Sequence, residues 1–357
     1  MKQLLSKRKK VGNFRSLQFK ENLIDFSSND YLGLARSQHL KQAVLYEWES
    51  IDYLGSTGSR LLTGNSMYIE GLEARIARFH GFETGLIFNC GYMANIGLIS
   101  TMAEEEDTIL FDSHIHASMY EGIRLSRAKA FPFRHNDLDH LENRLKKATQ
   151  KGNTYICVES LYSTDGSITP LNGIFSLSLK YPSHLIVDEA HAVGIFGNQG
   201  RGLVYEAGLS GKIFAQIITF GKALGVFGAI ILGNEHVKES LVNFAKSFIY
   251  TTALPFPSLA AIKCSYELFP KLETERIYLR NLTQLVNRSQ TPIQPIPVAH
   301  NQAAHRVVSS LKQRGFDIRA FLSPTVQKGK EIIRLTLHAF NSKEELMHLL
   351  ELLRKYG

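Results

Sequence analysis

The sequence predicts a three-layer α/β protein. Its mostly parallel central sheet carries helices on both faces, and a smaller α+β domain follows at the C-terminus. Short apolar runs of strand length alternate with amphipathic helical segments through the middle of the chain. Polar residues gather directly after those runs, as at the ligand-binding edge of open α/β sheets. The alternation ends near residue 235. We therefore expect an N-terminal segment over 1–50, a large domain over 51–235 and a small domain over 236–357.

The elements of the large domain follow from local patterns. Four apolar runs predict short buried strands, at 85–89, 108–111, 154–158 and 184–188. Helical periodicity predicts helices over 67–79 and 137–150, the second with Asp137 as its N-cap. Two β-branched clusters, 217–219 and 230–231, predict two strands joined by a glycine-rich turn.

The C-terminal part has a different pattern. A helix is predicted over 237–248, followed by a long helical stretch. The prolines at 292, 295 and 297 predict an extended linker into the small domain. A strand over 332–336 and an amphipathic helix over 343–356 end the chain.

Composition narrows the class of protein. The 357 residues are 44% hydrophobic and 21% charged, which is typical of a globular protein. Net charge is +8, and the one basic cluster, Lys7 to Lys10, is short and lacks interleaved aromatics. We therefore expect a solvated tail, with no nucleic-acid partner and no membrane partner. No apolar signal segment follows this start, and three widely spaced cysteines form no disulfide framework. Both observations favour a cytoplasmic protein.

Lys222 is the most informative single residue. From Ile213 to Gly233 it is the only charged side chain. Burying an ammonium group is unfavourable unless the group is paired or neutralised. A desolvated lysine can form a Schiff base with an aldehyde cofactor, which is one reason for such a placement. A membrane-spanning helix and a surface turn are the alternatives, and the central lysine and four glycines of this segment disfavour the helix.

Polar residues follow five of the predicted strands, in the segments 89–92, 114–118, 159–166, 188–191 and 219–222. Taken singly, Asp188 fits a helix N-cap, and His116 or His191 fits a buried core histidine. His114 and His116 have no third residue at metal-ligand spacing, so we expect no metal. Pyridoxal phosphate accounts for the whole set. It requires a lysine for its aldehyde, a carboxylate for its pyridine nitrogen, an aromatic plane against its ring, and amides with hydroxyls for its phosphate.

Five motifs carry a family resemblance: SNDYLGL at 28–34, GSTGSR at 55–60, HAS at 116–118, DEAH at 188–191 and TFGKA at 219–223. In this order they resemble the α-oxoamine synthases, and the resemblance runs from about residue 12 to the C-terminus. The resemblance implies a fold-type I pyridoxal phosphate transferase. Such enzymes join an amino acid to an acyl thioester with loss of carbon dioxide.

The resemblance also implies roles for the residues around the cofactor. Lys222 would bind the cofactor aldehyde and later move the substrate Cα proton, while Asp188 would pair with the pyridine nitrogen. His116 would stack on the ring, with Lys222 and Asp188 as its catalytic partners. The remaining cofactor contacts would come from Ser163 and His191 near the ring oxygen, and from Gly91, Tyr92 and Thr219 near the phosphate.

Substrate binding and partners are implied in the same way. The substrate contacts would come from Arg15, Asn29, His116, Thr325 and Arg334. The lysine motif, Gly228-Ala229 and the segment 248–252 look most like the members that use L-alanine and pimeloyl-CoA or a pimeloyl-carrier protein. Family members complete each active site with the neighbouring subunit, so a homodimer is expected.

Two departures and three alternatives accompany this interpretation. Relatives often have arginine where this chain has Leu322, and histidine where it has Ile69. The first alternative is a member that joins glycine to acetyl-CoA. The second is a non-catalytic synthase subunit, which the presence of Lys222 and Asp188 disfavours. The third is an aminotransferase or decarboxylase of the same fold, which the motifs around Arg15 and Asn29 disfavour.

Overall fold

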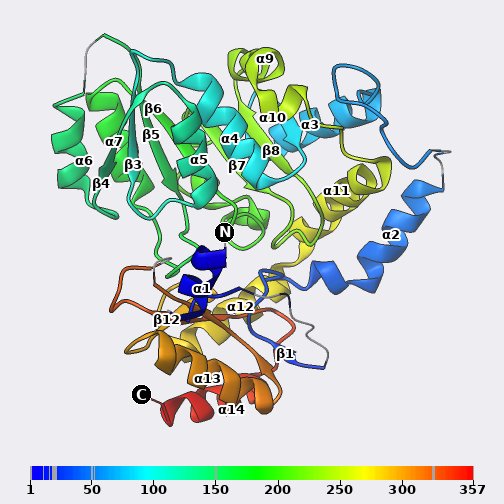
Figure 1. Cartoon of the computed structure of the whole chain (residues 1–357). Helices are drawn as coiled ribbons and strands as arrows, with labels where there is room; N and C mark the ends of the chain where they lie inside the picture. The colour runs from blue at the N-terminus through cyan, green and yellow to red at the C-terminus, as the bar shows by residue number, and fades with distance from the viewer. Residues whose placement is uncertain are drawn as a thin grey trace. The chain divides into compact units, whose positions relative to one another are not determined.

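The computed structural model describes residues 2–10, 12–15, 17, 22–49, 51, 53–148, 151–323 and 326–356. The chain divides into two compact units, both drawn in Figure 1. The sheet unit comprises Leu32–Tyr162 and Ile168–Glu273, and the terminal unit comprises Met1–Tyr31, Ser163–Ser167 and Thr274–Gly357. These boundaries differ from the predicted domains 1–50, 51–235 and 236–357, which stay a prediction.

A seven-stranded sheet forms the centre of the sheet unit, in the order β2-β8-β7-β6-β5-β3-β4. The strands are β2 (Thr84–Phe88), β3 (Thr108–Asp112), β4 (Lys129–Phe133), β5 (Thr154–Glu159), β6 (His184–Asp188), β7 (Ala215–Thr219) and β8 (Ala229–Gly233). Neighbours from β4 to β7 pair in parallel, whereas β8 is antiparallel to both β7 and β2. The prediction of a mostly parallel sheet is confirmed.

Helices cover both faces of this sheet, which confirms the predicted three layers (Figure 1). On one face, apolar side chains of α4, α5, α9 and α10 pack against inward-facing strand residues such as Ile109, Cys157 and Ile217. The helices of the unit are α2 (Gln38–Trp48), α3 (Met67–His80), α4 (Gly91–Met102), α5 (Ala117–Leu125), α6 (Leu138–Leu145), α7 (Leu171–Lys180), α8 (Leu203–Glu206), α9 (Glu235–Phe244), α10 (Lys246–Ile249) and α11 (Phe256–Leu268). No helix among the described residues is both long enough and apolar enough to span a membrane.

The four predicted strands correspond to β2, β3, β5 and β6, and the predicted pair around the glycine-rich turn corresponds to β7 and β8. Sequence analysis missed β4. This strand lies at the sheet edge and exposes Lys129, Phe131 and Pro132, so it has no continuous apolar run. Proline is tolerated there because an edge strand has one side without ladder hydrogen bonds.

The helix starts predicted near 67, 137 and 343 agree with the structure, and some ends do not. The Asp137 carboxylate caps α6 by accepting a bond from the backbone N–H of His140 at 2.8 Å, as predicted. The helix ends at Leu145, short of the predicted end at 150. The single helix predicted over 237–248 is wrong, because Ala245 adopts extended backbone (ψ 100°) and separates α9 from α10.

The terminal unit contains a three-stranded antiparallel sheet, β11-β12-β9, and a short parallel pair, β1-β10. Its strands are β1 (Ile24–Asp25), β9 (Ile293–Pro297), β10 (Phe316–Asp317), β11 (Arg319–Phe321) and β12 (Ile332–Thr336). Its helices are α1 (Lys2–Lys10), α12 (Glu273–Val286), α13 (Asn301–Gln313) and α14 (Lys343–Arg354). The first residue of α12, Glu273, belongs to the sheet unit.

Two predictions for the terminal unit had different outcomes. The strand predicted over 332–336 is β12, and the final helix begins at Lys343 behind a capping box formed by Ser342 and Glu345. The linker predicted from the prolines at 292, 295 and 297 is wrong, because Pro295 and Pro297 lie in β9. This strand is at the edge of its sheet. Proline has no backbone N–H, and on the open side of an edge strand no hydrogen bond of the sheet is lost for that reason.

Candidate active site

Lys222 lies directly after β7, in the turn that leads to β8. Gly225 sits in this turn with φ 69°, and a Cβ there would lie 2.3 Å from the Ala35 nitrogen, so only glycine fits. The adjacent Ala223 and Leu224 are buried, whereas Lys222 is half-buried. The turn therefore presents the lysine at the carboxyl edge of the sheet while the residues after it anchor in the core.

The Lys222 Nζ atom lies 2.8 Å from the Nε2 atom of His191. A hydrogen bond between two nitrogens requires one of them to offer a lone pair. His191 belongs to the loop after β6, so this contact joins the loops that follow two neighbouring parallel strands. It gives the lysine a partner that can share its proton.

Asp188 is the last residue of β6, and only 4% of its surface is exposed. One carboxylate oxygen accepts a bond from the backbone N–H of Ala190 at 2.8 Å. The other accepts a bond from the Asn95 side-chain amide on α4 at 2.7 Å. Donors from two elements thus fix the carboxylate where a buried negative charge can face a cationic ring nitrogen.

His116 is the N-cap of α5, and its Nδ1 atom accepts a bond from the backbone N–H of Ser118. Partial burial lowers the pKa of His116; the charge of Asp188 opposes this change and that of Lys222 adds to it. The Tyr92 ring meets the imidazole edge-on, with 6.4 Å between centroids. The Asp188 and Lys222 charges therefore both act on this imidazole, which is favoured as a neutral ring.

The N-terminus of α4 faces Thr219. The N-cap Cys90 makes no side-chain hydrogen bond to the helix, so Gly91 and Tyr92 open the helix without a side-chain cap. A Cβ at Gly91 would lie 3.3 Å from the Cβ of Thr219, which places the threonine hydroxyl beside the first turn. Uncapped N–H groups, a helix dipole and a hydroxyl are the elements of a phosphate site.

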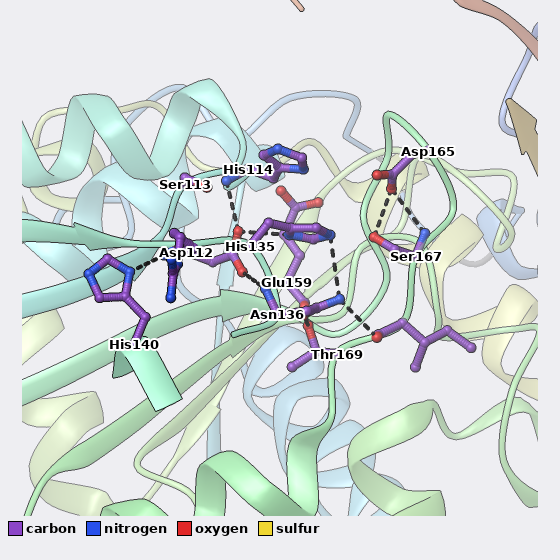
Figure 2. A network of polar contacts seen from close by, with 12 residues as sticks. Asp112, Ser113, His114, His135, Asn136, His140, Glu159, Asp165, Ser167 and Thr169 are labelled. Carbon is purple, nitrogen blue, oxygen red and sulfur yellow. Dashed lines mark hydrogen bonds and ion pairs between the residues drawn. The ribbon is translucent and has the colours of Figure 1, made fainter. Parts of the chain in front are cut away.

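A separate polar network joins the loop before His116 to residues that follow β4 (Figure 2). The fully buried Asp112 accepts bonds from the His135 ring at 2.9 Å and from the backbone N–H groups of His114 and Asn136, both at 2.8 Å. Burial acts to raise the pKa of Asp112, but the bonds from His135 and Asn136 outweigh it and hold the pKa below its usual value. The His114 and His135 rings stack with centroids 4.0 Å apart. This network fixes the loop that carries His116.

Three of the predicted site residues lie together in the terminal unit. The Arg334 guanidinium donates to the Ser163 carbonyl at 3.0 Å, to the Asn29 side-chain oxygen at 3.1 Å and to the Ser27 carbonyl at 3.3 Å. Its Nε atom is buried and has no hydrogen-bond partner among the described residues. Burial lowers the pKa of Arg334, and the Phe321 ring lies 5.1 Å away.

The other substrate residues are less well defined. Arg15 belongs to the terminal unit and is exposed. Thr325 lies outside the described residues. Of the two departures, Leu322 is partly buried in the terminal unit, and Ile69 is buried in α3.

Sequence reasoning missed Asn95, which bonds directly to Asp188. One signal was available: Asn95 is the only amide side chain in the apolar segment 91–102, and it is four residues after Gly91. A buried amide side chain needs a hydrogen-bond partner, and here that partner is the Asp188 carboxylate of β6.

The side chains of the sheet unit fit pyridoxal phosphate. A lysine, a buried carboxylate, a neutral imidazole and an open helix N-terminus with a hydroxyl are all found at one edge of the sheet. Fold and site together define the class: fold-type I pyridoxal phosphate-dependent enzymes.

Comparison with known proteins narrows this class. The model of the family aminotransferase class I and II matches residues 21–353. An 8-amino-7-oxononanoate synthase of Emericella nidulans is 39% identical, over 92% of this chain and 88% of the relative. The chain therefore belongs to the class I and II aminotransferase family and, within it, to the α-oxoamine synthases, as its motifs predicted.

Two solved structures agree with this assignment. The 8-amino-7-oxononanoate synthase of Francisella tularensis has a TM-score of 0.81 at 29% identity, covering 94% of this chain and 98% of that one. The serine palmitoyltransferase of Sphingomonas wittichii has a TM-score of 0.91 at 25% identity, covering 99% and 96%. The predicted fold class is confirmed.

Proposed function

We propose that this protein condenses L-alanine with a pimeloyl thioester, with loss of carbon dioxide, to give 8-amino-7-oxononanoate, a step of biotin biosynthesis. Pyridoxal phosphate is its cofactor. The observation that carries the proposal is the Lys222 Nζ atom held 2.8 Å from His191, in a chain 39% identical to an 8-amino-7-oxononanoate synthase.

The bound cofactor would withdraw electrons from the amino-acid Cα, which makes its proton removable. Lys222 would bind the cofactor aldehyde, and after displacement by the substrate its Nζ atom would take and return the Cα proton. His191, 2.8 Å from that nitrogen, would orient it and share the proton. The buried Asp188 would keep a proton on the pyridine nitrogen.

The phosphate would sit at the start of α4, held by the N–H groups near Gly91 and Tyr92 and by the Thr219 hydroxyl. His116 would stack on the ring. In the terminal unit, Arg334 and Asn29 would bind the substrate carboxylate, with Arg15 and Thr325 completing the substrate contacts. Ser163 would lie near the cofactor ring oxygen.

We also propose a cytoplasmic homodimer. The sheet unit leaves large apolar side chains in water, with Met67 91% exposed, Leu62 81% and Tyr250 80%. Covering these side chains with a second copy of the chain would remove apolar surface from water, which favours association. Light scattering at micromolar concentration should give twice the monomer mass of 40.2 kDa, and a monomer would contradict the proposal.

The test of the reaction is product analysis by mass spectrometry. Purified protein loaded with pyridoxal phosphate is given each combination of L-alanine, glycine or L-serine with pimeloyl-CoA, acetyl-CoA or palmitoyl-CoA. We expect 8-amino-7-oxononanoate from alanine and pimeloyl-CoA. A product from glycine and acetyl-CoA alone would move the protein to the alternative ligase reaction. A product from serine and palmitoyl-CoA alone would instead assign to this protein the reaction of a serine palmitoyltransferase.

A further inference from the structure

A continuous chain of hydrogen bonds joins His116 to Asp188 inside the sheet unit. The Asn95 amide nitrogen lies 2.7 Å from an Asp188 carboxylate oxygen and 3.0 Å from the Ser118 hydroxyl. The Ser118 hydroxyl lies 2.7 Å from the Nδ1 atom of His116. Asn95 is 2% exposed and Ser118 is fully buried, so water does not compete for these bonds.

The orientation of the Asn95 amide follows from its neighbour. A carboxylate only accepts hydrogen bonds, so the NH₂ group of Asn95 must face Asp188. Its two hydrogens then serve Asp188 and Ser118. The amide oxygen of Asn95 is left buried without a hydrogen-bond partner among the described residues. An unmade bond of this kind is unfavourable, and here it accompanies a charge-assisted bond to the carboxylate.

This orientation sets the direction of the next bond. Because the Ser118 oxygen accepts from Asn95, the hydroxyl hydrogen is available to the Nδ1 atom of His116. The backbone N–H of Ser118 points at the same atom, at 3.2 Å. Two donors on one ring nitrogen require that nitrogen to carry a lone pair, so the imidazole proton must lie on Nε2.

We propose that Asn95 and Ser118 are positioning residues which hold His116 as the neutral Nε2–H tautomer and couple it to the carboxylate of Asp188. The inference rests on the proposed function, in which His116 stacks on the cofactor ring. The His116 imidazole then offers its Nε2–H as a donor on the side away from Ser118, and the Asn95 amide bonds both to Ser118 and to the Asp188 carboxylate.

The test is nitrogen-15 NMR of the intact protein labelled on its histidine rings. His116→Asn identifies the His116 signals by their loss. In the wild type without and with pyridoxal phosphate, we expect an unprotonated Nδ1 and a protonated Nε2. Ser118→Ala removes the stronger donor, so the population with the proton on Nδ1 should rise at least threefold. Ser126→Ala is the matched control, because Ser126 ends the same helix and its hydroxyl donates to the Ile123 carbonyl, outside the chain of bonds that reaches His116.

A protonated Nδ1 in the wild type would overturn the proposal, and that measurement needs no variant to fold. Unchanged His116 signals in a folded Ser118→Ala protein would overturn it as well. Asn95→Leu removes the hydrogen bond to the charged Asp188 carboxylate. We expect this loss to raise the dissociation constant of the cofactor roughly tenfold. An unchanged constant would remove Asn95 from the proposal. The wild-type NMR result requires no turnover, so it stands apart from any failure to form 8-amino-7-oxononanoate.

Discussion

Asp188 and Glu189 are adjacent carboxylates at the end of the same strand, β6, yet their surroundings differ in kind. Asp188 is held by Asn95 and Ala190 near Lys222 and His116. Glu189 is fully buried on the other side of the chain and accepts bonds from the backbone N–H groups of Leu203 and Val204 at 2.8 and 3.1 Å.

Glu189 also accepts a bond from the Gln216 side chain at 2.9 Å. The loop it holds needs glycine: a Cβ at Gly202, where φ is 100°, would lie 2.1 Å from the Glu189 carboxylate. One dipeptide therefore serves two purposes. The Asp188 carboxylate lies in the candidate active site, and the Glu189 carboxylate anchors the glycine-rich loop that precedes α8. Substitutions in the candidate active site should therefore lower activity, whereas substitutions at Glu189 should lower stability.

The largest effect is expected for Lys222→Ala. Loss of the proton-transfer group should lower turnover by about a thousandfold or more, while the melting temperature stays within about 3 °C because Lys222 is only half-buried. Lys212→Ala, an exposed lysine before β7, is the control and should retain wild-type turnover. Steady-state kinetics and thermal unfolding test both statements, and a Lys222→Ala protein with more than a tenth of wild-type turnover would contradict the assignment.

Glu189→Ala should show the opposite pattern. The substitution leaves the backbone N–H groups of Leu203 and Val204 without their acceptor and creates a cavity. The free energy of unfolding should therefore fall by about 3 kcal/mol. Glu239→Ala on the exposed face of α9 should change it by less than about 0.5 kcal/mol. Urea unfolding measures both. Equal losses in the two variants would show that Glu189 does not anchor the loop.

The pH dependence of stability gives a second measure of Glu189. Burial raises the pKa of Glu189 from 4.5 to about 7, although its bonds from the Val204 and Leu203 N–H groups oppose the change. Between these two values the unfolded chain releases the proton and the folded chain keeps it. The stabilisation is therefore complete below pH 4.5 and is lost as pH rises towards 7, by up to about 3 kcal/mol.

Glu189→Gln should remove this contribution. Urea unfolding at pH 5.0 and pH 7.5 should show a smaller difference between the two pH values in the variant than in the wild type, and parallel profiles would refute the raised pKa. Other groups also titrate in this range, so the comparison between the two proteins carries the result, and the wild-type slope alone does not.

The fold was predictable where one physical signal dominated. Buried strands such as β5 and β6 consist of continuous apolar residues, and Asp137 caps α6 because a short carboxylate reaches the free N–H groups of a helix start. Two edge strands, β4 and β9, were not predictable in this way. Both contain proline and neither is buried throughout, so neither local pattern nor propensity separates them from loops.

The site shows the same division. Lys222 and Asp188 stand out because a charge among apolar residues requires a reason. The contact of Asn95 with Asp188 spans 93 residues of sequence, and that of Arg334 with Ser163 spans 171. Pairings at such separations depend on strand order and helix placement, which no local pattern in a single sequence encodes.

The smallest effect is expected for Asp112→Asn, which tests the network of Figure 2. The new amide keeps an acceptor for His135 and the His114 N–H but turns a donor towards the Asn136 N–H. The free energy of unfolding should fall by about 2 kcal/mol. Since the loop it holds carries His116, KM for the amino acid should rise about threefold while turnover changes less. Asp139→Asn, an exposed residue of α6, is the control with the same change of charge. If both variants keep wild-type KM and stability, the loop holds its shape without Asp112, and the position of His116 depends on the Ser118 and Asn95 side of the site alone.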